Sequence, residues 1–193
     1  MSNPYSEDRL IQAAAANLLH DELEWDSVFA FDSETFGENG TLGRTSEKEV
    51  ILDRYLRSAL RKFNSWLTPQ QEEEAVKNIH HHVSTASLMQ TNEEKYKMIR
   101  DGIKVSCTKP DGTPGKRNAK VIDFKNPTKN SFIAVRELWI KGAYHRRRAD
   151  IIGFVNGLPL LFVELKNHYV DIVEAYDKNY TDYQDTIPHL FFC

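Results

Sequence analysis

The chain has 193 residues, 40% of them hydrophobic, and its 25 Lys and Arg against 28 Asp and Glu give a net charge of −3. This length fits one domain with a substantial core, and the slightly acidic balance means that any surface for nucleic acid has to be local. The two cysteines exclude a disulfide framework, and the lack of a signal peptide or of about 18 consecutive apolar residues predicts a cytoplasmic protein.

The first half of the chain is expected to be helical. Ser6 can cap a helix whose apolar residues recur at helical spacing, namely Leu10, Ile11, Ala14, Ala15, Leu18 and Leu19. Further helices are predicted from Ser46 to about Phe63, after the capping pair Thr68-Pro69, and from Asn92 to about Gly102. Residues 32–44 are rich in Gly, Ser and Thr, so they predict a mobile loop.

The second half of the chain predicts a mixed β-sheet. Strands are expected, in chain order, at 104–107, 120–124, 132–140, 149–155 and 160–166, with a helix over 171–183 and a further strand from Pro188. With the N-terminal helices packed on this sheet, the expected fold is α/β. Because the chain stops within an apolar strand, we expect residues 1–193 to be a single domain that is part of a longer protein.

Three charged residues interrupt the most apolar part of the sequence. Two apolar runs are joined by Asn156-Gly157, a typical hairpin turn, and Asp150, Glu164 and Lys166 lie at the outer ends of these runs. Burial of an unpaired carboxylate there is unfavourable, and a metal ion with a polyanionic substrate would offset that cost. Strand alternation places Glu164 and Lys166 on one face, where carboxylates can hold a divalent cation and the ammonium can help the attacking water.

The same three-residue spacing occurs elsewhere in the chain, so the spacing alone is weak evidence. Glu93-Glu94-Lys95 lies in a polar helical stretch, which favours a solvated ion pair. Asp123-Phe124-Lys125 is followed at once by the strand-breaking pair Asn126-Pro127. For Asp150, Glu164 and Lys166 the alternative is an ordinary ion pair in the core or at a sheet edge.

The segment from Asp150 through the hairpin to Lys166 resembles the N-terminal nuclease family of type I restriction enzyme R subunits. In that PD-(D/E)xK family an Asp opens one strand and an NGxPL hairpin leads into an ExK strand, as Asn156 to Leu160 and Glu164 to Lys166 do here. The resemblance implies that Asp150, Glu164 and Lys166 are catalytic and that Asp150 and Glu164 bind Mg²⁺, with Mn²⁺ as a substitute. An acidic residue of the first helix often joins such a site, and Glu7 is the matching residue.

The chain departs from the family pattern in two places. Ala149 stands where the family usually has Pro, and the family's Gln-x-x-x-Tyr motif is matched here only by Asn179 and Tyr183, which we expect to contact DNA. The cationic cluster Arg146, Arg147 and Arg148 precedes Asp150 and is either a second DNA contact or a solvated loop.

The resemblance also implies a substrate and partners. These are double-stranded DNA and the modification (methyltransferase) and specificity subunits of a type I complex. ATP would act only through a downstream translocase, since Gly115-Lys116-Arg117 lacks the spacing of a P-loop. The alternatives are a repair or homing nuclease of the same fold and a non-catalytic module that clamps DNA or docks a partner.

A shared metal site makes a geometric demand on the hairpin. If Asn156-Gly157 were a strict two-residue turn in a regular ladder, Asp150 would lie opposite Val163 and would face away from Glu164. The site therefore predicts one extra residue, either in a three-residue connection from Asn156 to Leu158 or in a bulge.

Overall fold

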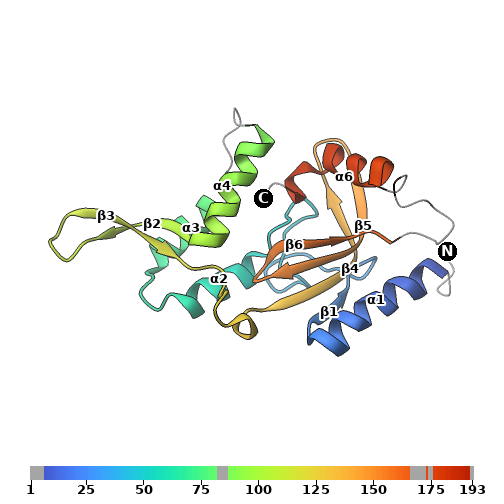
Figure 1. The fold of residues 1–193 in the computed structure, drawn as a ribbon, viewed down its shortest axis with the longest axis horizontal. Helices are drawn as coiled ribbons and strands as arrows, with labels where there is room; N and C mark the ends of the chain where they lie inside the picture. The colour runs from blue at the N-terminus through green and yellow to red at the C-terminus, as the bar shows by residue number, and fades with distance from the viewer. Residues whose placement is uncertain (1–6, 82–86, 166–172, 174–175, 192–193) are drawn as a thin grey trace. The chain divides into compact units, whose positions relative to one another are not determined.

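The computed structural model describes residues 7–81, 87–165, 173 and 176–191 (Figure 1). Helices and a mixed sheet are both present, so the predicted α/β class is confirmed. The contacts divide the chain into two compact units. The sheet unit takes its described residues from Met1–Val50, Phe132–Phe154 and Pro159–Phe191, and the ribbon unit takes them from Ile51–Ser131 and Val155–Leu158. That residues 1–193 act as one nuclease domain stays a prediction.

The sheet unit is built on four strands in the order β1-β4-β5-β6. Their bounds are Asp26–Phe29 for β1, Phe132–Lys141 for β4, Arg146–Val155 for β5 and Leu158–Val163 for β6. β1 runs parallel to β4, with Val28 beside Val135. The sequence did not predict β1, because this strand has four residues and little of it is buried, so its apolar pattern is weak.

Helix α1 (Glu7–Leu23) lies on one face of this sheet. Ala16 packs against Ala134 and Ile151, with Val163 and Leu165 beside them. The expected apolar stripe was only partly right: Leu10, Ile11 and Leu18 are exposed, and between Leu10 and Leu23 the buried positions are Gln12 and Ala16. The helix rests on the sheet through small side chains, which allow a close approach.

The C-terminal segment covers the opposite face of the sheet (Figure 1). A π-helical turn (Tyr176–Tyr180), α6 (Thr181–Thr186) and a 3₁₀ turn (Pro188–Leu190) follow one another. The ring of Phe162 on β6 contacts Tyr183, with 5.2 Å between ring centroids. The strand expected from Pro188 is wrong, because Leu190 N bonds back to Ile187 O and closes a turn instead.

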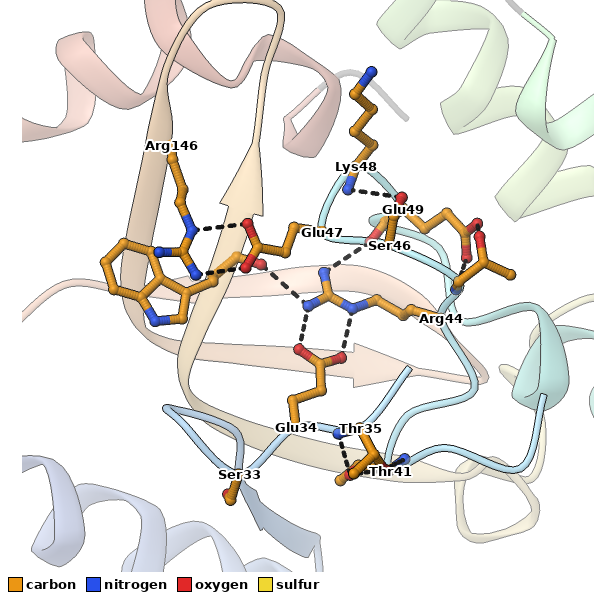
Figure 2. Close-up of polar contacts among 12 residues, drawn as sticks. Ser33, Glu34, Thr35, Thr41, Arg44, Ser46, Glu47, Lys48, Glu49 and Arg146 are labelled. Atoms are coloured by element: carbon orange, nitrogen blue, oxygen red, sulfur yellow. Dashed lines mark hydrogen bonds and ion pairs between the residues drawn. The ribbon is translucent and has the colours of Figure 1, made fainter. Parts of the chain in front are cut away.

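The loop expected over 32–44 is held in place by a buried ion pair (Figure 2). The Arg44 side chain, which is completely buried, donates from Nε and Nη2 to the two carboxylate oxygens of Glu34 at 2.8 and 2.5 Å. It also donates to the backbone oxygens of Glu49 and Trp139, at 3.0 and 3.1 Å. These bonds satisfy a guanidinium that would otherwise be costly to bury, and they fasten the loop to β4.

The ribbon unit contains α2 (Asp53–Phe63), α3 (Pro69–His80), α4 (Leu88–Asp101) and a two-stranded antiparallel ribbon of β2 (Ile103–Thr108) and β3 (Pro114–Ala119). The helix α3 begins where predicted, because Thr68 and Gln71 form a capping box. The same device at Ser87 and Gln90 starts α4 earlier than expected.

Two predictions for the ribbon unit are wrong. The helix expected from Ser46 begins only at Asp53, because Leu52 is buried in an extended approach and its N–H donates to Gly157 O. The strand expected at 120–124 lies instead at Pro114–Ala119, where the tight turn closed by Lys109 N and Thr113 O pairs it with β2. In the described part of the chain, no helix is long and apolar enough to cross a membrane.

Candidate active site

Asp150 and Glu164 lie on neighbouring segments of the sheet unit. Asp150 is in β5, and Glu164 follows the last residue of the adjacent strand β6. Glu164 shares its strand parity with Phe162, whose ring packs on Tyr183, and the charges of both Glu164 and Asp150 act on the Tyr183 hydroxyl. The two carboxylates therefore share one face of the sheet, as a common metal site requires.

The contact of Gly153 with Leu161 shows how the hairpin achieves this register. A β-carbon on Gly153 would lie 2.8 Å from Cβ of Leu161 and 2.7 Å from the Trp25 ring, so both positions face the same side and only glycine fits. Counting outward from this contact places Asp150 opposite Glu164. Asn156 and Gly157 nevertheless form a two-residue turn with φ of 51° and 84°.

The outcome for the hairpin prediction is therefore mixed. The three-residue connection from Asn156 to Leu158 is wrong, since β6 begins at Leu158. In a regular ladder from this turn Gly153 would pair with Leu160, so its contact with Leu161 indicates one extra residue within β6. That is the bulge which the sequence analysis gave as the alternative.

The carboxylate of Asp150 is held by two donors. Its Oδ1 accepts a hydrogen bond from Gln12 Nε2 at 2.8 Å, and its Oδ2 accepts one from Leu165 N at 2.8 Å. Because β6 ends at Val163, the carboxylate takes the place of a strand partner for the Leu165 N–H. Gln12 is 6% exposed, so its amide is committed to this contact.

Tyr183 lies beside the two carboxylates on the α6 side. Its side chain is buried, and its hydroxyl donates to Arg148 O at 2.7 Å. Burial raises the pKa of this phenol above its usual value, and the charges of Glu164 and Asp150 raise it further. Tyr183 is thus a neutral donor that fixes the backbone two residues before Asp150.

The structure brings together Asp150, Glu164 and Tyr183 from the predicted set. Lys166 lies outside the described residues, as do the side chains of Glu7 at the start of α1 and Asn179 in the π-helical turn. Gln12 was not predicted as a site residue, because its one signal in the sequence is a long amide within a mostly apolar helix.

The carboxylate oxygens of Asp150 and Glu164 are ligands of the kind that Mg²⁺ prefers. Among the described residues no three His, Cys, Asp or Glu side chains gather into a metal-binding group. Mg²⁺, however, commonly uses one or two carboxylates and completes its octahedron with water and substrate phosphate oxygens. Asp150 and Glu164 can supply those two carboxylates.

Arg146 and Arg147 are both engaged by carboxylates of the sheet unit. Arg146 forms two hydrogen bonds with Glu47, at 2.7 and 2.5 Å, and its guanidinium lies 3.8 Å from the centre of the Trp139 ring (Figure 2). Arg147 forms two with Asp182 on α6, at 2.6 and 2.9 Å. These pairs tie β5 to the segments that flank it.

Arg148 faces a buried and unusual glutamate. Its Nη1 lies 3.5 Å from Glu137 Oε2, and Glu137 is 1% exposed with a φ of 51° inside β4. Arg146, Arg147 and Arg148 therefore lie in a strand, so the solvated-loop alternative is wrong. A DNA contact by these three residues stays a prediction, and it would have to compete with their ion pairs.

The two other acid-x-Lys triplets have structural roles. In α4, Glu93 pairs with Lys97, and the buried Lys95 donates to the backbone oxygens of Ile79 and His81. The Asp123 carboxylate accepts from the backbone N–H groups of Lys125 and Asn126 in a turn. Neither triplet presents its carboxylate as a ligand.

Comparison with known proteins matches nearly the whole chain to one family model and about three quarters of it to individual relatives. Residues 4–192 match the family model described as type I restriction enzyme R protein N terminus. A type I restriction enzyme HindI endonuclease subunit from Haemophilus influenzae is 35% identical over 159 residues, which cover 79% of this chain. A putative type I restriction enzyme MjaIXP endonuclease subunit from Methanocaldococcus jannaschii is 27% identical over 153 residues, or 77% of this chain. The chain spans 14% of the length of each of these two relatives.

Proposed function

Because the chain belongs to the family of type I restriction enzyme R protein N termini, we propose that it is a metal-dependent endonuclease domain that hydrolyses DNA phosphodiester bonds. Its relatives are named endonuclease subunits of type I restriction enzymes. The observation that carries the proposal is the shared face of Asp150 and Glu164, with the Asp150 carboxylate oriented by Gln12 and Leu165.

In this proposal Asp150 and Glu164 hold Mg²⁺, or Mn²⁺ in its place, and Glu7 is a further candidate ligand. The bound ion would polarise a phosphoryl oxygen and lower the pKa of a coordinated water. Lys166 follows Glu164 by two residues, so strand-like alternation would place its ammonium on the same side, where it orients the attacking water. The Gln12 amide and the Leu165 N–H keep the Asp150 oxygens in position for the ion.

Tyr183 and Asn179 are assigned to the support of this site. The Tyr183 hydroxyl holds the backbone of Arg148, and thereby the start of the segment that carries Asp150. Asn179 precedes Tyr183 by one helical turn, and we propose that it contacts the DNA backbone. Arg146, Arg147 and Arg148 would contact DNA only if their ion pairs with Glu47, Asp182 and Glu137 are broken.

The partners follow from the family. We propose double-stranded DNA as the substrate, together with modification and specificity subunits in a cytoplasmic type I complex. ATP would be consumed by a motor region in the part of the relatives that this chain does not span.

Cleavage in the assembled enzyme tests the proposal. With Mg²⁺ and ATP present, Glu164→Gln should lower the rate of plasmid cleavage by at least about 100-fold while DNA binding persists, because the substitution removes a metal ligand but keeps the shape. Glu22→Gln, an exposed change on α1, is the matched control and should cut at the normal rate. Normal cleavage by the Glu164 variant would show that the site is wrongly assigned.

A further inference from the structure

The ribbon of β2 and β3 carries a local excess of positive charge. Between Ile103 and Lys120 the chain has five cationic residues (Lys104, Lys109, Lys116, Arg117 and Lys120) and one acidic residue, Asp111, for a net charge of +4. Since the whole chain has a net charge of −3, all the remaining residues together carry −7. A surface of this sign on an acidic chain is the local feature that nucleic-acid binding requires.

The far part of the ribbon is exposed on both faces. From Thr108 to Asn118 every residue except Gly115 is exposed, and the ribbon extends beyond the helices of its own unit (Figure 1). No apolar side chain in this stretch needs to be covered, so packing does not explain its shape. A two-stranded ribbon of this kind has the dimensions to enter the major groove of duplex DNA.

A hollow beside the ribbon, close to the turn that joins its two strands, is lined by three of the cations. Its volume is about 520 Å³, and its lining consists of Trp66, Thr68, Gln71, Cys107, Thr108, Lys109, Pro110, Lys116 and Arg117. The lining contains no carboxylate. An anion in this hollow would meet cationic side chains without displacing a carboxylate of the lining, although Lys116 also borders a second hollow whose lining includes Glu94 and Asp101.

The cations of the hollow are held by carbon contacts rather than by ion pairs. The guanidinium of Arg117 lies 4.0 Å from the centre of the Trp66 ring, which orients its N–H groups without neutralising them. The Lys109 stem lies over Gly115, where an added Cβ would come 2.9 Å from Lys109 Cγ. Within the described residues, Lys109, Lys116 and Arg117 form no ion pair.

We propose that the ribbon and its hollow bind the phosphate backbone of double-stranded DNA. The inference rests on the proposed function only in taking duplex DNA as the substrate, since the residues are separate from Asp150 and Glu164. Lys109, Lys116 and Arg117 neutralise phosphates, and the exposed strands lie along the groove. This contact gives affinity without reading the base sequence.

Fluorescence anisotropy with a labelled duplex in EDTA tests the proposal, because the chelator separates binding from cleavage. The variant K109Q/K116Q/R117Q should bind at least about tenfold more weakly, and the slope of log K against log salt should become shallower by up to about 3. The variant K125Q/K129Q/K141Q makes the same change in net charge at other exposed lysines and should bind almost as the unaltered chain does.

A second variant keeps the test independent of folding. K109R/K116R retains the charges and should retain the affinity, and circular dichroism should be the same for all variants. Equal losses in K109Q/K116Q/R117Q and K125Q/K129Q/K141Q would overturn the proposal, as would tighter binding of single strands than of the duplex or no duplex binding by the unaltered chain. Duplex binding by the chain without metal-dependent cleavage by the assembled enzyme would instead contradict the proposed function and leave the ribbon contact intact.

Discussion

Two groups of three cationic residues in this chain carry the same charge and differ in their surroundings. Arg146, Arg147 and Arg148 each lie against a carboxylate of the sheet unit, whereas Lys109, Lys116 and Arg117 line a hollow without one. A cation that is already paired stabilises its own fold, and a phosphate must displace its partner to bind. The residues that already pair with a cationic cluster, more than its density of charge, therefore decide whether the cluster can bind a polyanion.

The largest expected effect concerns the most deeply paired cation, Arg44. Glu34→Gln leaves the completely buried guanidinium without its carboxylate, so the free energy of unfolding should fall by about 3 kcal/mol or more. Urea unfolding measures this change, and the exposed substitution Glu22→Gln is the control. A loss no larger than that of the control would mean that the backbone oxygens of Glu49 and Trp139 suffice for Arg44.

A smaller effect is expected at Asp150, whose carboxylate is held by two neutral donors, the Gln12 amide and the Leu165 N–H. Gln12→Leu removes the amide that donates to Asp150 Oδ1, so cleavage should slow by about tenfold and the Mg²⁺ concentration for half-maximal rate should rise. Asn17→Leu, at an exposed position of the same helix, should change neither quantity. A normal rate with a normal Mg²⁺ requirement in the Gln12 variant would remove this residue from the site.

The smallest effect is expected for a partly exposed pair. Hydrogen bonds from Arg147 lower the pKa of Asp182, so the stabilisation is present above the unfolded pKa near 4 and is lost as the pH falls through the lower folded value. Asp182→Asn should cost up to about 1 kcal/mol at pH 7 and a smaller amount at pH 3, which lies below the unfolded pKa. Asp185→Asn, exposed on the same helix, is the control for urea unfolding at both pH values. A deficit at pH 3 as large as that at pH 7 would contradict an ionic origin.

The sequence predicted the elements whose signals are local. Thr68 and Gln71 cap α3, and the charged residues Asp150 and Glu164 mark the site because they interrupt apolar runs. The contacts that depend on the fold were not predictable: Gln12 reaches Asp150 across 138 positions of the chain. The bulge in β6 could be anticipated only as one of two alternatives, since the close contact of Gly153 with Leu161 exists only in three dimensions.

The partners of the charged residues likewise depend on the fold and could not be predicted from the sequence. Arg44 stands in a Gly-rich stretch that predicts an open loop, and its partners Glu34 and Trp139 are brought to it by the sheet. Conversely, Lys116 and Arg117 do not have the spacing of a P-loop, and no other role can be predicted for them from the sequence. The sequence does not show that they line a hollow beside Trp66 whose lining contains no carboxylate.

Calorimetric titration with Mg²⁺ or Mn²⁺ tests the central claim, that Asp150 and Glu164 share one divalent cation. Asp150→Asn and Glu164→Gln should each weaken metal binding by at least about tenfold, because each substitution removes a carboxylate ligand of the same ion. Lys166→Ala should change the affinity little, since an ammonium is not a ligand. Equal metal affinity in the Glu164 and Lys166 variants would contradict the account.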